Sequence, residues 1–152
     1  MNDRTDTNNQ AILIGIDPDC DKSGVAIWRP SDKCYKLFNF IFFELLDFLS
    51  VRKHNIRLVV IEAGWLNKST WHGASGKGCS VSARIGKNVG SNHEAGRKIV
   101  EMCEYLRLSY ELVKPTAKSS KLGREEFARI TGIKGITNAD KRDAMMLVFG
   151  RS

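Results

Sequence analysis

The chain has 152 residues, with 24 lysines and arginines against 17 aspartates and glutamates, which gives a formal net charge of +7. This length predicts one domain, and an apolar share of 42% is ordinary for a globular one. No apolar run reaches the roughly 18 residues of a membrane-spanning helix, so we expect no membrane span. The positive charge is compatible with a nucleic-acid partner, with an acidic protein, or with no polyanionic partner.

The first ten residues are polar and contain no apolar segment, so we expect a disordered leader rather than a secretory signal. A single domain is expected over residues 11–152. The four cysteines lack the paired spacing of a zinc site and, without a secretory signal, do not indicate a disulfide framework. Reduced thiols are typical of the cytoplasm, where we expect the protein to be located.

The first forty residues predict three antiparallel strands. Residues 11–16 form an apolar, β-branched run that predicts a buried strand. A turn around Pro18 leads to a second strand at 24–28, so these two strands form a hairpin. Residues 35–40 alternate in character and predict the third strand.

The pattern then changes to that of a helix followed by another strand. Apolar residues recur with helical spacing from Phe42 to Leu49, which predicts an amphipathic helix that ends near residues 54–55. Residues 58–62 are apolar on both faces. They predict a fourth strand near the centre of the sheet.

Residues 63–93 contain no acidic residue but six glycines and two tryptophans. A stretch this polar and rich in glycine predicts a long loop. Its cations and aromatic rings suit contact with phosphates and stacking on bases, and the alternative is a solvated insertion without a partner. The cations expected to contact nucleic acid are Lys68, Lys77, Arg84 and Lys87.

The last third of the chain predicts one more strand and three helices. Residues 91–94 have the spacing of a capping box, which predicts that a helix begins there. A fifth strand is expected at 110–113, a helix at 120–131 and a last helix from 137 to about 149. The order predicts an α/β fold in which three antiparallel strands are followed by two parallel strands in one mixed five-stranded sheet, with helices on both faces.

Four acidic residues stand at the ends of these elements. Asp17 follows the first strand and Glu62 ends the fourth, so parallel pairing of the two strands would place both carboxylates at one edge of the sheet. Asp140 and Asp143 are three residues apart and share a face of the last helix. The acids also have ordinary interpretations, for example Asp17 as a turn residue and Asp140 as a charge in the first turn of a helix.

Carboxylates gathered in one place repel one another unless protons or cations neutralise them. Oxygen-only ligands suit Mg²⁺ or Mn²⁺, and two such ions would activate a water and stabilise the leaving oxygen of a phosphodiester. A basic protein with such a site is a nuclease candidate. The acids from Asp17 to Asp21 also alternate as in a calcium loop, but Lys22 and Trp28 stand where that loop needs Gly and Glu, so we reject it.

Three segments that contain these acids resemble the motifs of a known family, the RuvC-type Holliday junction resolvases of the RNase H-like superfamily. The segments are Ile14-Gly-Ile-Asp17-Pro18 with Ser23-Gly24, Val60-Ile-Glu62, and Asn138-Ala-Asp140-Lys-Arg-Asp143-Ala144. The resemblance covers residues 11–150. It implies an RNase H-like nuclease domain that cuts four-way DNA junctions, with Mg²⁺ or Mn²⁺ held by Asp17, Glu62, Asp140 and Asp143.

The resemblance also implies roles for one aromatic residue and several lysines. Trp65 stands three residues after the second acid, where the family has an aromatic residue that stacks on an unpaired base at the crossover. Lysines that follow the fifth strand are expected near the scissile phosphate. Lys114, Lys118 and Lys121 lie in that region, and either Lys118 or Lys121 is preferred for the catalytic role.

A homodimer is implied as well, because a two-fold junction suits a two-fold protein. The helix from Glu94 to Arg107 is expected to form the dimer face or, alternatively, only to cover the sheet. The family usually has Gly where this chain has Asp19, which adds a charge beside the expected metal site. Two other functions stay open: a related nuclease acting on RNA–DNA hybrids, flaps or precursor RNA, and a non-catalytic nucleic-acid-binding relative.

Overall fold

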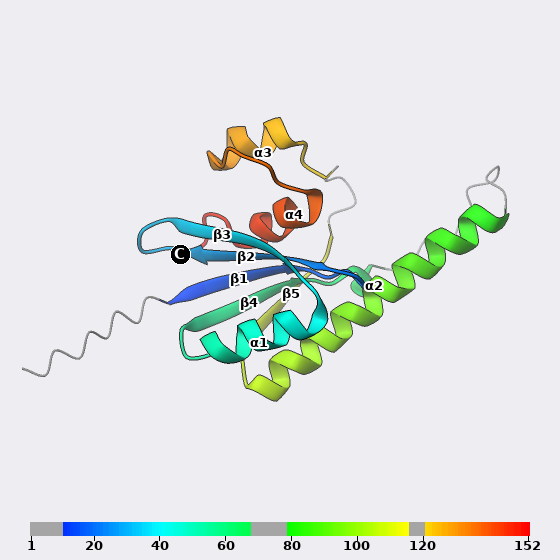
Figure 1. Ribbon diagram of the computed structural model, residues 1–152, viewed down its shortest axis with the longest axis horizontal. Coiled ribbons are helices and arrows are strands. Elements are labelled where there is room, and N and C mark those ends of the chain that lie inside the picture. Colours follow the sequence, from blue (N-terminus) through cyan, green and yellow to red (C-terminus); the bar gives the residue numbers. More distant parts are fainter. Residues whose placement is uncertain (1–10, 68–78, 116–120) are drawn as a thin grey trace, which may run out of the picture.

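The structure, a computed structural model, describes residues 11–67, 79–115 and 121–152, and it describes only the backbone of residues 79–86. Five strands form one sheet in the order β3-β2-β1-β4-β5 (Figure 1). In chain order the strands are β1 (Ile12–Asp17), β2 (Ser23–Arg29), β3 (Cys34–Phe40), β4 (Ile56–Glu62) and β5 (Tyr110–Val113). All five strands predicted from the sequence are confirmed. The expected leader, residues 1–10, lies outside the described residues.

The pairing of the strands makes the sheet mixed. β1 lies at its centre, antiparallel to β2 and parallel to β4, and β2 pairs antiparallel with β3. β4 is also parallel to β5. The β-branched composition of β1 and β4 suits strands that are covered on both faces. The expected arrangement of antiparallel strands followed by parallel ones is therefore confirmed.

Helices cover both faces of the sheet. The helices are α1 (Phe42–Arg52), the short 3-10 helix η1 (Gly64–Leu66), α2 (Cys79–Leu106), α3 (Arg124–Thr131) and α4 (Ala139–Val148). Figure 1 shows α1 and α2 on one face and α3 and α4 on the other. Because side chains alternate along a strand, Ile14 and Ile16 of β1 belong to the first core cluster, whereas Leu13 packs with Phe127 and Met145 in the second.

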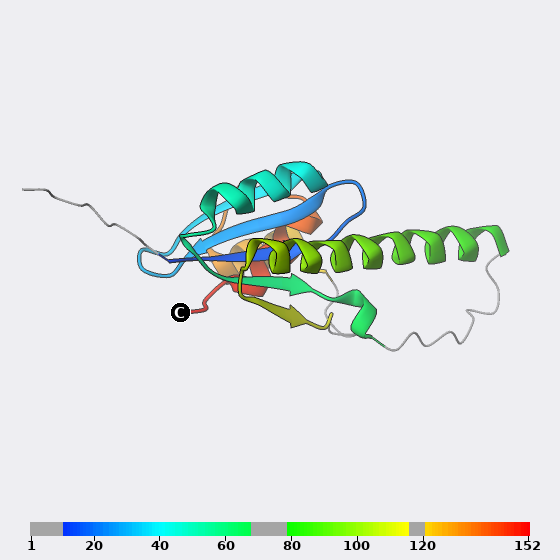
Figure 2. The same cartoon turned by 90° about the horizontal axis from the view of Figure 1, so that it is seen from below.

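The predicted loop at 63–93 is wrong over its second part, because α2 begins at Cys79 and not near residue 91. Gly86 and Gly90 lie inside this helix, and glycine lowers helix propensity by about 1 kcal/mol relative to alanine, which is why the sequence indicated a loop. The C-terminal half is anchored in the core by Ile99 and Cys103, and a helix that is already nucleated extends readily. Figures 1 and 2 show the first turns of α2 projecting beyond the sheet.

The last two helices are close to their predicted positions. α3 begins at Arg124, after Gly123, and ends at Gly132, whose positive φ of 74° is the left-handed conformation expected of a terminating glycine. The Asn138 side chain caps α4 by accepting a hydrogen bond from the backbone N–H of Lys141. Within the described ranges, no helix has both the length and the apolar character needed to cross a membrane.

Candidate active site

Asp17 and Glu62 are the last residues of two neighbouring parallel strands. Ile16 of β1 pairs with Ile61 of β4, so the next residue of each strand stands at the same edge of the sheet. Asp17 is 9% exposed, and Glu62 is half-buried. Both line a cavity of about 190 Å³, whose other lining residues are Pro18, Gly64, Trp65, Val89, Asn92, His93 and Lys121.

Two glycines let α4 bring the other two acids to this edge. A Cβ at Gly24 would lie 2.1 Å from the backbone oxygen of Asp140, and a Cβ at Gly15 would lie 2.1 Å from that of Ala144. No larger residue fits at either position while the helix stays where it is. Because Gly24 pairs with Asp17 across the sheet, this close approach sets the start of α4 beside the end of β1.

The electrostatics of Asp17 reflect its burial and its neighbours. Burial raises the pKa of this carboxyl to about 8, and the negative charge of Glu62 adds to the effect. The Lys121 ammonium works in the opposite direction, while Asp143 and Asp140 raise the pKa further. At neutral pH, Asp17 therefore holds a proton unless a cation replaces it.

Two other acids of the set, Glu62 and Asp140, also have raised pKa values. Burial, followed by the charge of Asp143, raises the pKa of Glu62. Burial also raises the pKa of Asp140, and the nearby charges of Asp19 and Asp143 contribute. Acids from three distant segments of the chain thus repel one another at one edge of the sheet.

Lys121 provides the opposing charge. Its Nζ lies 3.1 Å from Oδ2 of Asp143, whose side chain is 15% exposed. Partial burial disfavours the ammonium, but the hydrogen bond and the charges of Asp143, Asp17 and Asp140 outweigh this and raise the pKa of Lys121. Lys118 lies outside the described residues, so the choice between the two lysines stays open. Lys114 is exposed beyond the end of β5.

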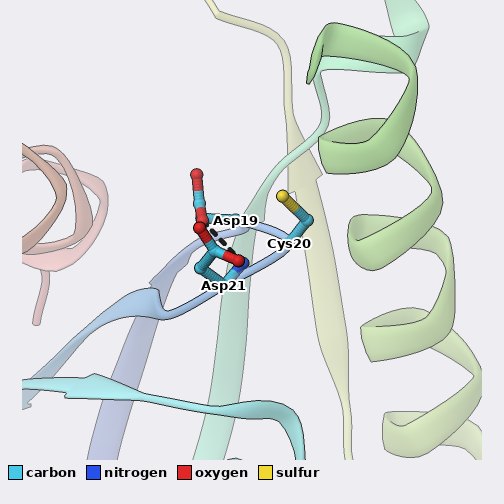
Figure 3. Close-up of side chains that lie close together, drawn as sticks. All are labelled: Asp19, Cys20 and Asp21. Atoms are coloured by element: carbon cyan, nitrogen blue, oxygen red, sulfur yellow. Dashed lines mark hydrogen bonds between the residues drawn. The ribbon is translucent and has the colours of Figure 1, made fainter. Parts of the chain in front are cut away.

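The oxygens of the four acids do not surround a single point. Among the described residues, no three of these carboxylates place a ligand oxygen within 4.8 Å of one another, whereas Asp19, Cys20 and Asp21 do bring ligand atoms that close together. Figure 3 shows these three residues on the loop between β1 and β2. One Asp19 oxygen accepts a hydrogen bond from the Asp21 N–H at 2.8 Å, the pattern of an ordinary turn.

Two neighbouring residues of α2, Asn92 and His93, contact the segments that follow Asp17 and Glu62. Asn92 accepts a hydrogen bond from the Cys20 N–H and donates one to Asp19, each at 3.1 Å. His93 packs on Gly64, where a Cβ would lie 2.9 Å from its Nε2 atom. Asn92 and His93 could not be predicted from the sequence, because the spacing of residues 91–94 indicates a capping box there. No local pattern reveals contacts with Cys20 and Gly64, which lie about 70 and 30 positions away, respectively.

Trp65 lies on η1, three residues after Glu62, and is half-buried. Its ring packs on Gly96 of α2, where a Cβ would lie 2.2 Å from Cζ3, and the Arg97 guanidinium lies 5.9 Å from the ring centroid. The ring therefore joins the loop to α2 and also lines the cavity beside the acids. Its role in stacking on a base stays a prediction.

The cations predicted to contact nucleic acid are only partly described. Lys68 and Lys77 lie outside the described residues. Arg84 is placed on α2 by its backbone alone, and Lys87 is an exposed residue of the same helix. Residues 63–93, which contain no acidic residue, therefore include the first turns of α2. This changes the geometry of the surface expected to contact nucleic acid but not its charge.

Comparisons with known proteins support the fold. No protein-family model matches the chain, and no curated protein matches its sequence. Among solved structures, T. thermophilus RuvC in complex with a Holliday junction substrate matches with a TM-score of 0.51 and 12% sequence identity, over 90% of this chain and 89% of that chain. The chain thus has the RNase H-like α/β fold, as its sequence predicted.

Proposed function

We propose that the chain is a divalent-metal-dependent endonuclease that hydrolyses phosphodiesters at four-way DNA junctions. The observation that carries the proposal is the gathering of Asp17, Glu62, Asp140 and Asp143 at one edge of the sheet, where burial and mutual repulsion raise the pKa of Asp17 to about 8. The fold is one that T. thermophilus RuvC adopts in a complex with a Holliday junction. A set of mutually repelling acids is unfavourable without a cationic ligand, which favours a functional site over a structural one.

The donor set fits Mg²⁺ or Mn²⁺. All four side chains offer carboxylate oxygens, the ligands these ions prefer, and cations would replace the proton that Asp17 otherwise holds. We propose two ions for the site, the arrangement with which carboxylate-bound metals cleave phosphodiesters. When bound, such a pair activates a water and stabilises charge on the leaving oxygen.

The remaining groups of the site act on the nucleic acid. Lys121, which is paired with Asp143, is proposed to contact the phosphate that is cut, with Lys118 as the alternative. Trp65 stands at the same cavity, where it would stack on an unpaired base. The residues proposed to contact the phosphates of the junction arms are Lys68, Lys77, Arg84, Lys87 and Lys114.

A homodimer is part of the proposal, since a four-way junction presents two equivalent strands. Tyr105 of α2 is 81% exposed and Phe42 of α1 is 41% exposed, and both line a shallow groove with Leu46 and Met102. Lys98 and Glu101 lie at the same groove and offer polar contacts. Sedimentation of the protein alone tests this surface: Tyr105→Glu is expected to convert the dimer to monomer, and a wild-type monomer at all concentrations would rule the dimer out.

The experiment that tests the activity uses four substrates. The purified protein is incubated with a synthetic four-way junction, a linear duplex, a flap and an RNA–DNA hybrid, each with and without Mg²⁺. We expect cleavage of the junction, near its crossover and only with Mg²⁺. Cleavage of the hybrid or the flap in preference to the junction would assign the protein to a related nuclease activity, and junction binding without any cleavage would make it a binding protein.

A further inference from the structure

A second cavity, of about 530 Å³, lies at the opposite end of the sheet from the four acids of the proposed site. Its lining includes Ile12 at the start of β1, whereas Asp17 ends the same strand. Six residues of extended chain place these two ends roughly 17 Å apart. The cavity is therefore separate from the proposed catalytic edge and plays no part in the function proposed above.

The charged side chains that line this cavity are all positive. Arg29, Lys33, Lys36 and Arg52 line it, and none of the described residues that line it is acidic. Arg29 is paired with Asp32, from its NH2 group to Oδ2 at 2.7 Å, so its charge is largely matched. The ion pairs found in the described part of the chain include no partner for the other three cations.

Aromatic packing holds one of these cations, Arg52, in position. The Arg52 guanidinium lies 4.5 Å from the centroid of the Phe48 ring, which orients it at the end of α1. Phe48 in turn packs against Phe38, with ring centroids 5.8 Å apart, and Phe38 is itself part of the cavity lining. One of the three unmatched cations is thus held in place before any ligand arrives.

The floor of the cavity is apolar. Ile12, Ile27 and Phe38 line it from the sheet, and all three belong to or pack against the core cluster on this face. A volume of this size is in the range of small-molecule sites, roughly 300–1,000 Å³. A ligand that matches both the apolar floor and the cations combines a flat apolar part with a compact group that carries more than one negative charge.

We propose that this cavity binds a nucleoside monophosphate, either free or as the end of a nucleic-acid strand. The base would lie against the apolar floor, and the phosphate would be met by Lys33, Lys36 and Arg52. A phosphate monoester carries close to two negative charges at neutral pH, which suits several cations better than a single carboxylate would. Arginine and lysine are also the side chains that most often bind phosphate.

Two cysteines provide a test on the wild-type protein. Cys34 is exposed and lines the cavity, whereas Cys20 is exposed near the acidic edge. The rate at which iodoacetamide alkylates each thiol is measured by mass spectrometry with increasing deoxyadenosine monophosphate. At about ten times the dissociation constant, occupancy of about nine-tenths is expected to slow the alkylation of Cys34 about tenfold and to leave Cys20 unchanged.

The two possible sources of the ligand are distinguished by a 5′-phosphorylated single-stranded oligonucleotide. Protection of Cys34 by the mononucleotide supports a site for free nucleotides, and protection by the oligonucleotide alone supports a site for strand ends. An unchanged rate with both probes overturns the proposal. Equal protection by inorganic phosphate or by deoxyadenosine overturns it too, because recognition would then need only one half of the ligand.

A pair of charge reversals gives a second measurement. Lys36→Glu is expected to weaken protection by the mononucleotide about tenfold, because one favourable charge is replaced by a repulsive one. Lys53→Glu is the matched control, since Lys53 is exposed and follows Arg52 directly but does not line the cavity. Equal weakening by both variants would show an effect of overall charge and overturn the assignment to this cavity.

Discussion

The backbone oxygen of Asp140 lies so close to Gly24 that a Cβ at position 24 would stand 2.1 Å from it. Gly24 is also the residue that pairs with Asp17 across β1 and β2. One contact between backbones therefore joins the segments of two acids that are more than 120 positions apart. The geometry of the proposed site depends on a glycine that has no functional group of its own.

Gly24→Ala is expected to push α4 away from the sheet. Overpacking of this kind costs about 1–3 kcal/mol, so urea unfolding should show a loss of stability in that range together with a loss of cleavage. Gly123→Ala is the control, because a Cβ at Gly123 meets nothing within 4 Å and the backbone there is extended. If Gly24→Ala were as stable and as active as Gly123→Ala, α4 would not pack as closely as described.

The raised pKa of Asp17 predicts how stability depends on pH. Its pKa is about 8 in the folded chain against an ordinary value of 3.8, so the folded state binds more protons between these two values. Stability contributed by the protonated form is complete below pH 3.8 and is lost as pH rises towards 8. The measurement is the midpoint of thermal unfolding at several pH values without divalent cations.

Two variants make this pH test specific. Asp17→Asn removes the buried charge, so at pH 8 it is expected to be more stable than the wild type by about 1–3 kcal/mol. It should also lose the part of the pH dependence that Asp17 contributes, while the raised pKa values of Glu62 and Asp140 keep the remainder. Mg²⁺ should stabilise the wild type at pH 8 but not this variant. Asp21→Asn, an exposed residue of the neighbouring loop, should behave as the wild type. A wild-type stability that rises from pH 5 to 8 would contradict the raised pKa.

Lys121 is expected to control the pH range of cleavage. Its charge lowers the pKa of Asp17, so Lys121→Gln should raise that pKa and move the rise of the cleavage rate to higher pH. Lys121→Arg keeps the charge and should keep the wild-type profile, and Lys53→Gln is an exposed control outside the proposed site. Profiles that coincide for the Gln variant and the wild type would remove Lys121 from the site and leave Lys118 as the preferred lysine.

Asn92 is expected to position the loop that follows Asp17. It makes two hydrogen bonds to the Asp19–Cys20 segment, and Asn92→Ala removes both. We expect cleavage to fall by about tenfold, since a misplaced site loses rate steeply, with faster hydrogen exchange at Cys20 and Asp21. Asn88→Ala, an exposed residue one helical turn earlier on α2, is the matched control. Unchanged exchange in the loop of Asn92→Ala would show that these bonds do not fix it.

The sequence predicted the elements whose signal is local and strong. The strand at 12–17 follows from its β-branched run, and the end of α3 follows from Gly132. Asp17 and Glu62 stand at the ends of two apolar strands, so they lie side by side on the condition that these strands pair in parallel, which the structure shows. A few residues of sequence were enough for each of these predictions.

The rest depends on contacts between distant segments. The first turns of α2 were missed because Gly86 and Gly90 weaken the helical signal, and the helix is sustained by its anchored C-terminal half. Asn92 and His93 act on loops that lie about 70 and 30 positions away, respectively, so nothing around them in the sequence identifies them. The packing of Trp65 on Gly96 is likewise invisible until both segments are placed.

The most direct test of the account is the cleavage of a four-way junction by amide variants of the acidic set. Asp17→Asn, Glu62→Gln and Asp143→Asn each keep the size of the side chain but remove a metal-binding charge, so with Mg²⁺ each should abolish cleavage and leave junction binding intact. Asp21→Asn should cleave as the wild type does. If all three variants of the set cut at the wild-type rate, the four carboxylates are not the metal site, and the proposed function is wrong.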